Sequence, residues 1–506
     1  MRPDAPQDSA FSHQSNPSQP SGSHQPIDLR DRAERAARDA GFETHFSPQA
    51  QAEAARLSQL PSADDASIRD LSGLLWSSID NEESRDLDQV EWCERGGNNS
   101  IRVLIGIADV ASQVLEGSAI NTHAALNTTS IYTGIETFPM LPERLSTDLT
   151  SLLPGEERLA IVIEMSVASD GQVLASNIYR ARLKNAAKLV YESIGDWLDS
   201  SSPAPPEVAR VAGLEAQMRL QWEAAQRLKA QREREGALDV DLPEARAVVS
   251  NGRVTGLEVQ RKNPARLIIE SFMVTANMVL AQFLEAQNIP AIQRVVRQPE
   301  RWPRIVQLAQ DHGAQLPAQP DSRALSAFLS AQKAQAPERF GDLSLAVLKL
   351  LGRGEYVVVH GAGDSIGHFG LGMHNYAHST APNRRFPDLI TQRILGALLA
   401  KAPAPYAPAD LESIAARCTE REAAAQKVER LMRKVAAAAL LSDRVGEVFG
   451  AVVTGASDKG TYVRSDSPPV EGRLMRGERG LDVGDKVRVR LTHADAERGF
   501  IDFERA

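Results

Sequence analysis

Cysteine and long apolar runs are scarce in this sequence, and their scarcity excludes several classes of protein. Of the 506 residues only two are cysteines, Cys93 and Cys418, which excludes a disulfide framework and a zinc site built from cysteines. No stretch approaches the length of a transmembrane helix, and the N-terminus lacks the apolar core of a signal peptide. We therefore expect no membrane contact and no disulfide partner, in a reducing, cytoplasmic setting.

Lysine and arginine are also fewer than aspartate and glutamate. The chain has 57 lysines and arginines against 66 aspartates and glutamates, which gives a net charge of -9. This balance does not indicate a nucleic-acid-binding protein, but it does not exclude one, because a narrow basic channel can lie inside an acidic protein. The carboxylates of a metal site would themselves add to the negative total.

The N-terminal part of the chain differs in composition from the rest. Residues 1–27 are rich in Ser, Pro, Gln, His and Asp, which is typical of a disordered tail. In residues 28–66, Ala33, Ala37 and Ala40 recur with the spacing of one helix face. This spacing predicts a short helical segment, which we expect to pack against the domain that follows.

A short polar loop within residues 77–92 gathers three aspartates, Asp80, Asp86 and Asp88. Asp86 and Asp88 are two residues apart, so they point the same way in an extended segment, and the interval back to Asp80 allows a turn. Hard cations such as Mg²⁺ prefer carboxylate oxygens, and such clusters often act on phosphates. A solvated acidic turn would have the same composition, whereas an EF-hand is excluded because its central Gly and terminal Glu are missing.

This loop and the motifs around it resemble the ribonuclease II/R family of 3′→5′ exoribonucleases. The catalytic RNB domain of that family carries the pattern T-I-D-x5-D-x-D-D. Here Asp80, Asp86 and Asp88 occupy the first three acidic positions, and Gln89 occupies the fourth. The resemblance begins near Asp70 and continues to the C-terminus.

Further motifs of the family follow in order. Residues 130–159 resemble S-V-Y … P-M-L-P-x-x-L-S … S-L-x-P-G-E-x-R-L, and residues 367–393 resemble Y-x-H-F-T-S-P-I-R-R-Y-P-D-L. After Gly446 the chain changes to short β runs that resemble an S1 domain, a five-stranded OB-fold barrel. We therefore expect an α/β RNB catalytic domain over residues 67–443 and an all-β, S1-like RNA-binding barrel over residues 444–506.

The resemblance also implies a metal centre. Two ions of Mg²⁺, or of Mn²⁺, would be held by four side chains: Asp80, Asp86, Asp88 and Gln89. Arg384 aligns with the arginine that binds the scissile phosphate, so Asp88 and Arg384 are the predicted catalytic residues. A guanidinium suits that task because it donates two parallel hydrogen bonds and stays charged. The amide of Gln89 is a neutral ligand, which predicts a raised metal requirement.

The family's RNA contacts match five further side chains: Tyr132, Tyr191, Glu270, Glu429 and Tyr462. Tyr132 would stack on bases, and each such stack contributes roughly 1–3 kcal/mol whatever the base. Tyr191 would position the terminal nucleotide. Glu270 lies in an apolar helical stretch, which favours a paired or functional role over a solvated one. Val240 stands where some relatives have a clamping Phe, which predicts a weaker clamp.

Other polar residues have competing interpretations. His368, His374 and His378 suggest a zinc site, but no carboxylate motif of the HExxH type accompanies them, so we expect them to support the loop or contact RNA. Asp109 follows the apolar run of Ile101–Val114, which predicts a buried strand. It would either cap the next turn or support the metal loop.

The sequence thus favours a metal-dependent, hydrolytic 3′→5′ exoribonuclease that degrades single-stranded RNA to nucleoside 5′-monophosphates. Gln89 and Val240 motivate an alternative, a catalytically impaired RNB-fold protein that only binds RNA. A nuclease directed at DNA or oligonucleotides is a third interpretation, against which Tyr191 and Glu270 argue. Protein partners are not indicated by any motif.

Overall fold

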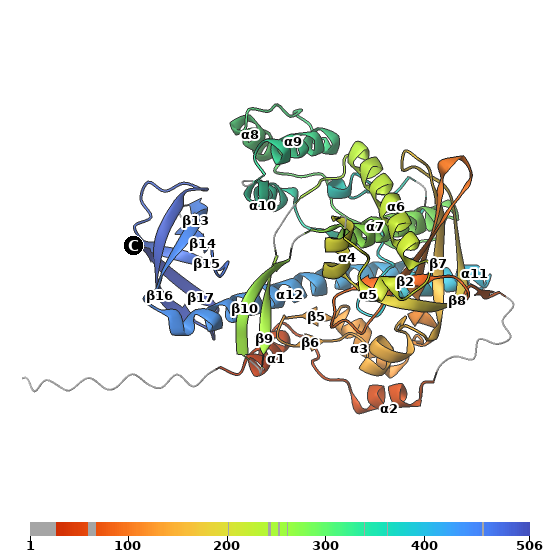
Figure 1. The fold of residues 1–506 in the computed structure, drawn as a ribbon. Coiled ribbons are helices and arrows are strands. Elements are labelled where there is room, and N and C mark those ends of the chain that lie inside the picture. Colours follow the sequence, from red (N-terminus) through yellow and green to blue (C-terminus); the bar gives the residue numbers. More distant parts are fainter. Residues whose placement is uncertain are drawn as a thin grey trace, which may run out of the picture.

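The computed structural model describes residues 27–58, 67–200, 202–240, 244–250, 253–260, 262–337, 340–361, 363–457 and 460–506. The predicted disordered tail lies outside the described residues, apart from Ile27. Two bodies are visible in Figure 1, a larger domain and a small β-barrel. The long helix α12 (Pro408–Leu441) runs from the first to the second.

The larger domain is built around a six-stranded sheet with the order β1–β8–β2–β3–β4–β7. β8 pairs in parallel with β1 and β2, and the other pairs are antiparallel. β7 also pairs along β8, so the two sides of the sheet are joined. The strand bounds are β1 (Arg69–Asp70), β2 (Trp76–Asp80), β3 (Gln89–Arg95), β4 (Ile101–Ala108), β7 (Glu157–Val167) and β8 (Val173–Val190).

The predicted strand at Ile101–Val114 is confirmed in its first part, β4, which is buried because its residues are apolar on both faces. It ends at Ala108. Asp109 then caps a short turn, η2 (Val110–Ser112), by accepting a hydrogen bond from the Ser112 N–H at 3.2 Å. Its other oxygen accepts from Arg180 at 2.9 Å, so the capping interpretation of Asp109 is confirmed.

Helices α4 (Tyr191–Leu198), α5 (Pro206–Ala209), α6 (Leu214–Glu235) and α7 (Pro264–Ala286) follow β8. α6 packs against β3 and α7. Periodicity alone predicts a single amphipathic helix from Glu207 to about Arg234. The chain instead breaks at Gly213, whose φ of +85° is left-handed and interrupts the helical path.

Helix α7 corrects the expectation that no stretch approaches a membrane-spanning length. By length and composition it is the one helix among the described residues that could cross a membrane. However, 67% of its most apolar window is buried inside the protein. Its apolar residues therefore belong to the core, where Ile268, Phe272 and Ala276 are covered by neighbouring elements.

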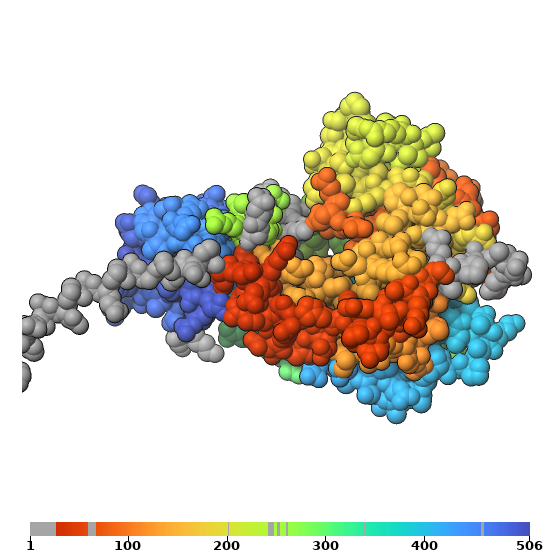
Figure 2. All heavy atoms as spheres, turned by 90° about the horizontal axis from the view of Figure 1, so that it is seen from below, coloured from red at the N-terminus to blue at the C-terminus, as the bar shows by residue number. Residues whose placement is uncertain are grey.

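The predicted helical segment near the N-terminus is confirmed as α1 (Leu29–Asp39) and α2 (Pro48–Arg56). Asp28 and Ser47 cap their first turns. Ala33 and Ala37 are fully buried in a cluster that includes residues of α12. In Figure 2 this red segment lies along the surface next to the blue barrel. The helices therefore pack as a cover on the rest of the protein.

The remaining elements of the larger domain connect these layers. Val240 is partly buried against a cluster that includes Trp302, Phe328 and Phe340, so its side chain contributes to packing there. The helices are α3 (Ala119–Asn127), α8 (Trp302–Asp311), α9 (Ser322–Gln335), α10 (Phe340–Leu351) and α11 (Phe386–Leu399), and the strands are β5 (Ile131–Tyr132), β6 (Thr137–Phe138), β9 (Glu244–Ser250), β10 (Arg253–Gln260), β11 (Ala291–Val295) and β12 (Glu355–Val359).

The predicted C-terminal barrel is also confirmed. Five strands close in the order β13–β14–β15–β17–β16 around Phe449, Val489 and Phe503. The barrel is tied to α1 through Arg32 and Arg35, which pair with Glu497 in the turn before the last strand. The strands are β13 (Val448–Ser457), β14 (Gly460–Ser465), β15 (Glu471–Arg476), β16 (Lys486–Asp495) and β17 (Phe500–Arg505).

The contact between the β7–β8 turn and α6 predicts a stability effect. Gly171 has a φ of +88°, and a Cβ added there would lie 2.0 Å from the carbonyl oxygen of Arg227. We expect Gly171→Ala to lower the free energy of unfolding by roughly 2–5 kcal/mol, since it combines left-handed strain with overpacking. Urea unfolding followed by circular dichroism measures this change.

Gly155→Ala is the matched control for Gly171→Ala. Gly155 has a similar φ of +82°, but nothing lies within 4 Å of a Cβ added there. Gly155→Ala should therefore lower the free energy of unfolding only by the left-handed strain, roughly 1–2 kcal/mol. Equal losses in the two variants would show that the contact with α6 is not tight.

Candidate active site

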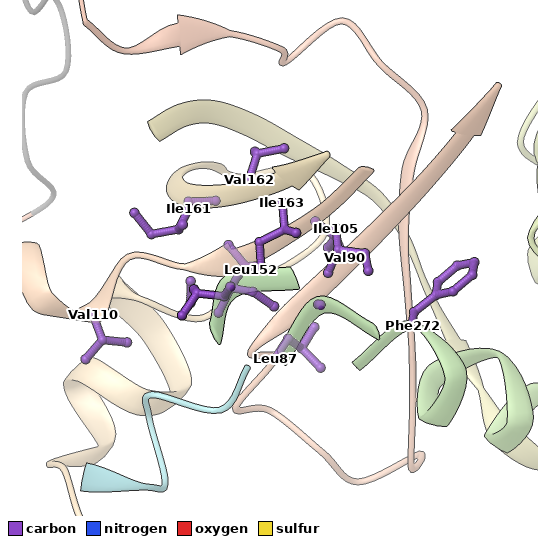
Figure 3. Close-up of a cluster of buried hydrophobic side chains, with 14 of the residues drawn as sticks. Leu87, Val90, Ile105, Val110, Leu152, Ile161, Val162, Ile163 and Phe272 are labelled. Carbon is purple, nitrogen blue, oxygen red and sulfur yellow. The ribbon is translucent and has the colours of Figure 1, made fainter. Parts of the chain in front are cut away.

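The acidic loop joins β2 to β3 and is anchored by Leu87. The side chain of Leu87 is buried in the same cluster as Leu152 (Figure 3). Its N–H donates to Ser151 Oγ at 3.0 Å, and its carbonyl accepts from the Leu152 N–H at 3.0 Å. Because side chains alternate along an extended chain, the burial of Leu87 places Asp86 and Asp88 on the opposite side from it.

Asp88 is the most deeply buried of the three aspartates, with 3% of its surface exposed. One carboxylate oxygen accepts from the Asn383 N–H at 3.1 Å, and the other lies 3.8 Å from Arg384 Nε. Burial raises the pKa of Asp88 to about 7, although Arg384 lowers it and the charge of Asp86 raises it further. The structure thus brings the two predicted catalytic residues together.

Asp86 and Asp80, the other two aspartates of the loop, each accept a hydrogen bond from a hydroxyl group. Tyr132 donates from its hydroxyl to Asp86 Oδ2 at 3.2 Å, and Ser84 Oγ donates to Asp80 Oδ1 at 2.7 Å. Burial raises the pKa of Asp86, and the charge of Asp80 raises it as well. Burial and mutual repulsion therefore both oppose ionisation of Asp86 and Asp88 in the absence of a cation.

Two adjacent arginines in the loop before α11, Arg384 and Arg385, have different surroundings. Arg385 is enclosed and donates to Asp388 Oδ1 at 2.7 Å, and that oxygen also accepts from the Ala381 N–H at 2.8 Å. Arg384 keeps 45% of its side chain exposed, with Asp88 as its carboxylate neighbour. Arg385 therefore fixes the loop, whereas Arg384 is available to a ligand.

Two of the predicted RNA contacts lie on the α4–α7 side of the site. Tyr191 begins α4 directly after Val190, which pairs with Asp80 across β8 and β2. The Arg266 guanidinium lies 4.4 Å from the centre of the Tyr191 ring. Glu270 on α7 is half exposed and lies 3.8 Å from buried Arg232.

The other predicted RNA contacts divide between the site and the barrel. Glu429 on α12 accepts from the Tyr132 N–H at 3.1 Å, so it positions the strand that carries Tyr132. Tyr132 is 42% exposed over the whole residue. Tyr462 lies on β14 of the barrel, where it is exposed opposite Arg473 on β15. It belongs to a surface separate from the acidic loop.

Two of the three histidines make hydrogen bonds within the protein, whereas His374 is exposed. His378 is partly buried and shares a hydrogen bond of 2.8 Å with the Tyr356 hydroxyl, and His368 Nδ1 accepts from the Leu371 N–H at 3.2 Å. Across the described part of the chain, no three His, Cys, Asp or Glu side chains converge closely enough to enclose an ion by themselves. The acidic loop nevertheless offers oxygen donors of the kind that suit Mg²⁺ or Mn²⁺.

Sequence reasoning did not single out two residues that shape this loop. Lys188 on β8 donates from Nζ to the carbonyls of Glu82 and Ser84, both at 2.6 Å, and so holds the loop against the sheet. Glu91 on β3 is fully buried, and both of its carboxylate oxygens lack a hydrogen-bond partner. A charged residue between the apolar Val90 and Trp92 was the available signal for Glu91.

The comparisons with known families agree with this geometry. The model of the RNB domain matches residues 68–401, and the model of the RNase II-type exonuclease C-terminal S1 domain matches residues 447–506. Ribonuclease R 1 of Lactococcus lactis is 28% identical over 84% of this chain and 55% of its own length. Ribonuclease R of Thermotoga maritima is 28% identical over 86% of this chain and 64% of its own. The chain thus spans 55% and 64% of the length of these two relatives.

Solved structures share the fold. Mycoplasma genitalium RNase R in complex with ribose-methylated single-stranded RNA superposes with a TM-score of 0.84 at 22% identity, covering 95% of this chain and 78% of that one. Yeast Ssd1, a pseudonuclease, gives a TM-score of 0.70 at 17% identity, covering 92% and 57%. Given the extent of the RNB match and the site it encloses, the chain belongs to the RNB-domain family and carries an RNase II-type C-terminal S1 domain.

Proposed function

We propose that this protein is a hydrolytic 3′→5′ exoribonuclease that acts on single-stranded RNA. The observation that carries the proposal is the pairing of buried Asp88 with the exposed guanidinium of Arg384. A binding protein has little need to bury a carboxylate beside a phosphate-binding cation. The relatives named ribonuclease R support the same activity.

A metal centre is part of this proposal. The residues that would hold the ions are Asp80, Asp86, Asp88 and Gln89, whose oxygen atoms suit a hard divalent cation. Bound Mg²⁺ or Mn²⁺, as two ions, would lower the pKa of the attacking water and stabilise the leaving 3′-oxygen. Tyr132 and Ser84 hold two of the carboxylates in place by hydrogen bonds.

Arg384 would neutralise the charge that the phosphate gains in the transition state. Its guanidinium can donate two parallel hydrogen bonds to phosphate oxygens. It keeps its position because its neighbour Arg385 is fixed by Asp388, and because its own carbonyl accepts from the Ser130 N–H at 3.0 Å. Arg384 is thus oriented from the backbone, and its side chain is left for the substrate.

The substrate would enter as a single strand. The exposed Tyr132 ring supports base stacking without sequence preference, and the RNase R of Mycoplasma genitalium forms a complex with single-stranded RNA. Tyr191, next to Asp80, would position the terminal nucleotide. The products would be nucleoside 5′-monophosphates, because the 3′-oxygen is the leaving group.

The second candidate is an RNA-binding protein of the same fold that does not cut. Gln89 in place of a carboxylate favours it, and the pseudonuclease Ssd1 shows that the fold also occurs without activity. Retention of both Asp88 and Arg384 in contact favours the enzyme. The following experiment separates the two.

Cleavage of a 5′-labelled single-stranded RNA tests the proposed activity. With Mg²⁺ or Mn²⁺ we expect a ladder that shortens from the 3′ end and releases nucleoside 5′-monophosphates. Asp88→Asn should lower the rate at least about a hundredfold, because a preorganised charge at the reacting phosphate is lost. Glu94→Gln, an exposed carboxylate change on the same strand β3, is the control and should cleave normally. Intact RNA held in a tight complex would support the binding protein.

The role of Tyr132 is tested by RNA affinity in the Asp88→Asn background. Tyr132→Ala should weaken binding by roughly 1–3 kcal/mol, because a stacking ring is removed. Tyr132→Phe keeps the ring and removes only the hydroxyl that donates to Asp86, so its affinity should stay within about threefold. Fluorescence anisotropy with a labelled oligonucleotide measures both. Equal weakening by the two variants would assign the effect to the hydroxyl.

The pKa of Asp88 predicts how stability depends on pH without divalent metal. The folded-state pKa of about 7 lies above the ordinary value near 3.9, so the folded protein keeps a proton that the unfolded chain releases. The stabilisation is complete below about pH 4 and is lost as pH rises through about 7, by at most about 4 kcal/mol. Urea unfolding in EDTA at pH 5 and pH 7.5 measures the loss, which Asp88→Asn should reduce. An unchanged pH dependence in that variant would contradict the assignment.

A further inference from the structure

A pocket outside the candidate active site lies against α6 and α7, which pack on each other (Figure 1). The turn between β7 and β8, the loop of residues 366–375 and the segment before α9 form its other walls. Its volume is about 890 Å³, which lies within the range of roughly 300–1,000 Å³ for small-molecule sites. Neither the acidic loop nor Arg384 lines this pocket, and the proposed mechanism gives it no role.

Arg232 on α6 lines the pocket and is buried, with 7% of its surface exposed. Its Nη2 donates to Ser271 Oγ at 3.1 Å and lies 3.8 Å from the half-exposed Glu270. Its Nε is buried and has no hydrogen-bond partner among the described residues. A buried donor on a charged group is costly to leave unsatisfied. The guanidinium therefore has donor capacity beside the pocket that the protein itself does not use.

Two further side chains of the pocket have unused polar atoms. Asn375 donates to Glu285, while its Oδ1 is buried without a partner among the described residues. Burial lowers the pKa of His368 to about 4, so the ring is neutral near neutral pH. Because His368 Nδ1 accepts from the Leu371 N–H at 3.2 Å, the proton of the neutral ring is on Nε2. The pocket thus combines donors at Arg232 and His368 with an acceptor at Asn375.

The carboxylates that line the pocket are engaged in hydrogen bonds within the protein. Glu235 accepts from Gln231 Nε2 at 2.7 Å, and Asp321 caps the first turn of α9. Arg323, in that first turn, is exposed at the rim of the pocket. An anionic group that enters the pocket therefore meets an arginine at the rim and a second arginine, Arg232, at the buried end.

One wall of the pocket is apolar. Met278 on α7 and the buried Met373 line it, and both belong to one small hydrophobic cluster. Methionine side chains adapt to the shape of a neighbour, and their sulfur makes favourable contacts with aromatic rings. This wall suits a flat aromatic group, whereas the buried end suits an anion.

We propose that this pocket binds a nucleoside 5′-monophosphate, with its phosphate at Arg232 and its base against Met278 and Met373. His368 would donate to the phosphate, and a ribose hydroxyl would donate to Asn375 Oδ1. The inference rests on the proposed function, because a nucleoside 5′-monophosphate is the product of that reaction. The ion pair of Arg232 with Glu270, a predicted RNA contact, joins the pocket to the candidate active site.

Binding of AMP to the full chain, measured by isothermal titration calorimetry in EDTA and without RNA, tests the proposal. Arg232→Gln should weaken AMP binding at least about tenfold, because charge-assisted hydrogen bonds to the phosphate are lost. Arg219→Gln makes the same change on the surface of α6, where Arg219 pairs with Glu215, and should leave the affinity unchanged. Arg384→Gln should also leave it unchanged, because Arg384 does not line the pocket.

Fragments of the ligand show which part is recognised. Adenosine and inorganic phosphate should each bind more weakly than AMP, because each contacts only one end of the pocket. If Arg232→Gln does not fold, Asn375→Ala at a partly exposed position decides, and it should weaken the binding of AMP but not of phosphate. Circular dichroism checks the fold of each variant. Phosphate that binds as tightly as AMP would indicate a site for free anions and overturn the inference.

The outcomes separate this proposal from the proposed function. If RNA is degraded but the wild type binds no AMP in EDTA, the inference is wrong and the proposed function stands. If AMP affinity falls in Arg384→Gln and not in Arg232→Gln, AMP occupies the candidate active site and the inference is overturned. If AMP binds through Arg232 but no RNA is cleaved, the nucleotide site stands and the proposed function falls.

Discussion

The burial of Leu87 in the core of the larger domain is the constraint on which the site depends. Its side chain is enclosed, and its backbone is bonded to Ser151 and Leu152 on a segment far away in the sequence. Fixing this one residue fixes the direction of the aspartates on either side of it. Asp86 and Asp88 can then lie on the same side of the chain despite their repulsion, because the free energy of burying Leu87 opposes the loop's opening.

The loop before α11 contacts the acidic loop through neighbouring residues that have different roles. Arg385 is held by Asp388, and the Asn383 N–H donates to Asp88. These bonds join the loop before α11 to the acidic loop and leave the Arg384 side chain exposed. The half-exposed Arg384 side chain lies 3.8 Å from the buried Asp88 carboxylate, and this geometry is the basis of the phosphate-binding role proposed for it.

The long helix α12 relates the site to the rest of the molecule. Glu429 on this helix holds the Tyr132 backbone, and the same helix ends at the barrel that carries Tyr462. α1 packs on α12 and reaches Glu497 of the barrel. The RNA surfaces proposed on the two bodies are therefore linked through one element, which the N-terminal helices reinforce.

Local pattern was enough to predict the features that lie within short segments. These are the alternation around Leu87, the apolar α7, the glycine-separated strands of the barrel and the spacing of the acidic motif. Which polar groups meet became visible only in the folded chain: Asp109 with Arg180, Glu270 with Arg232, and Glu91 with no partner. The fold also made α7 a core helix and broke the chain at Gly213. The physical reason is that pairing between distant segments depends on how the elements pack, and residue spacing within one segment carries no record of that packing.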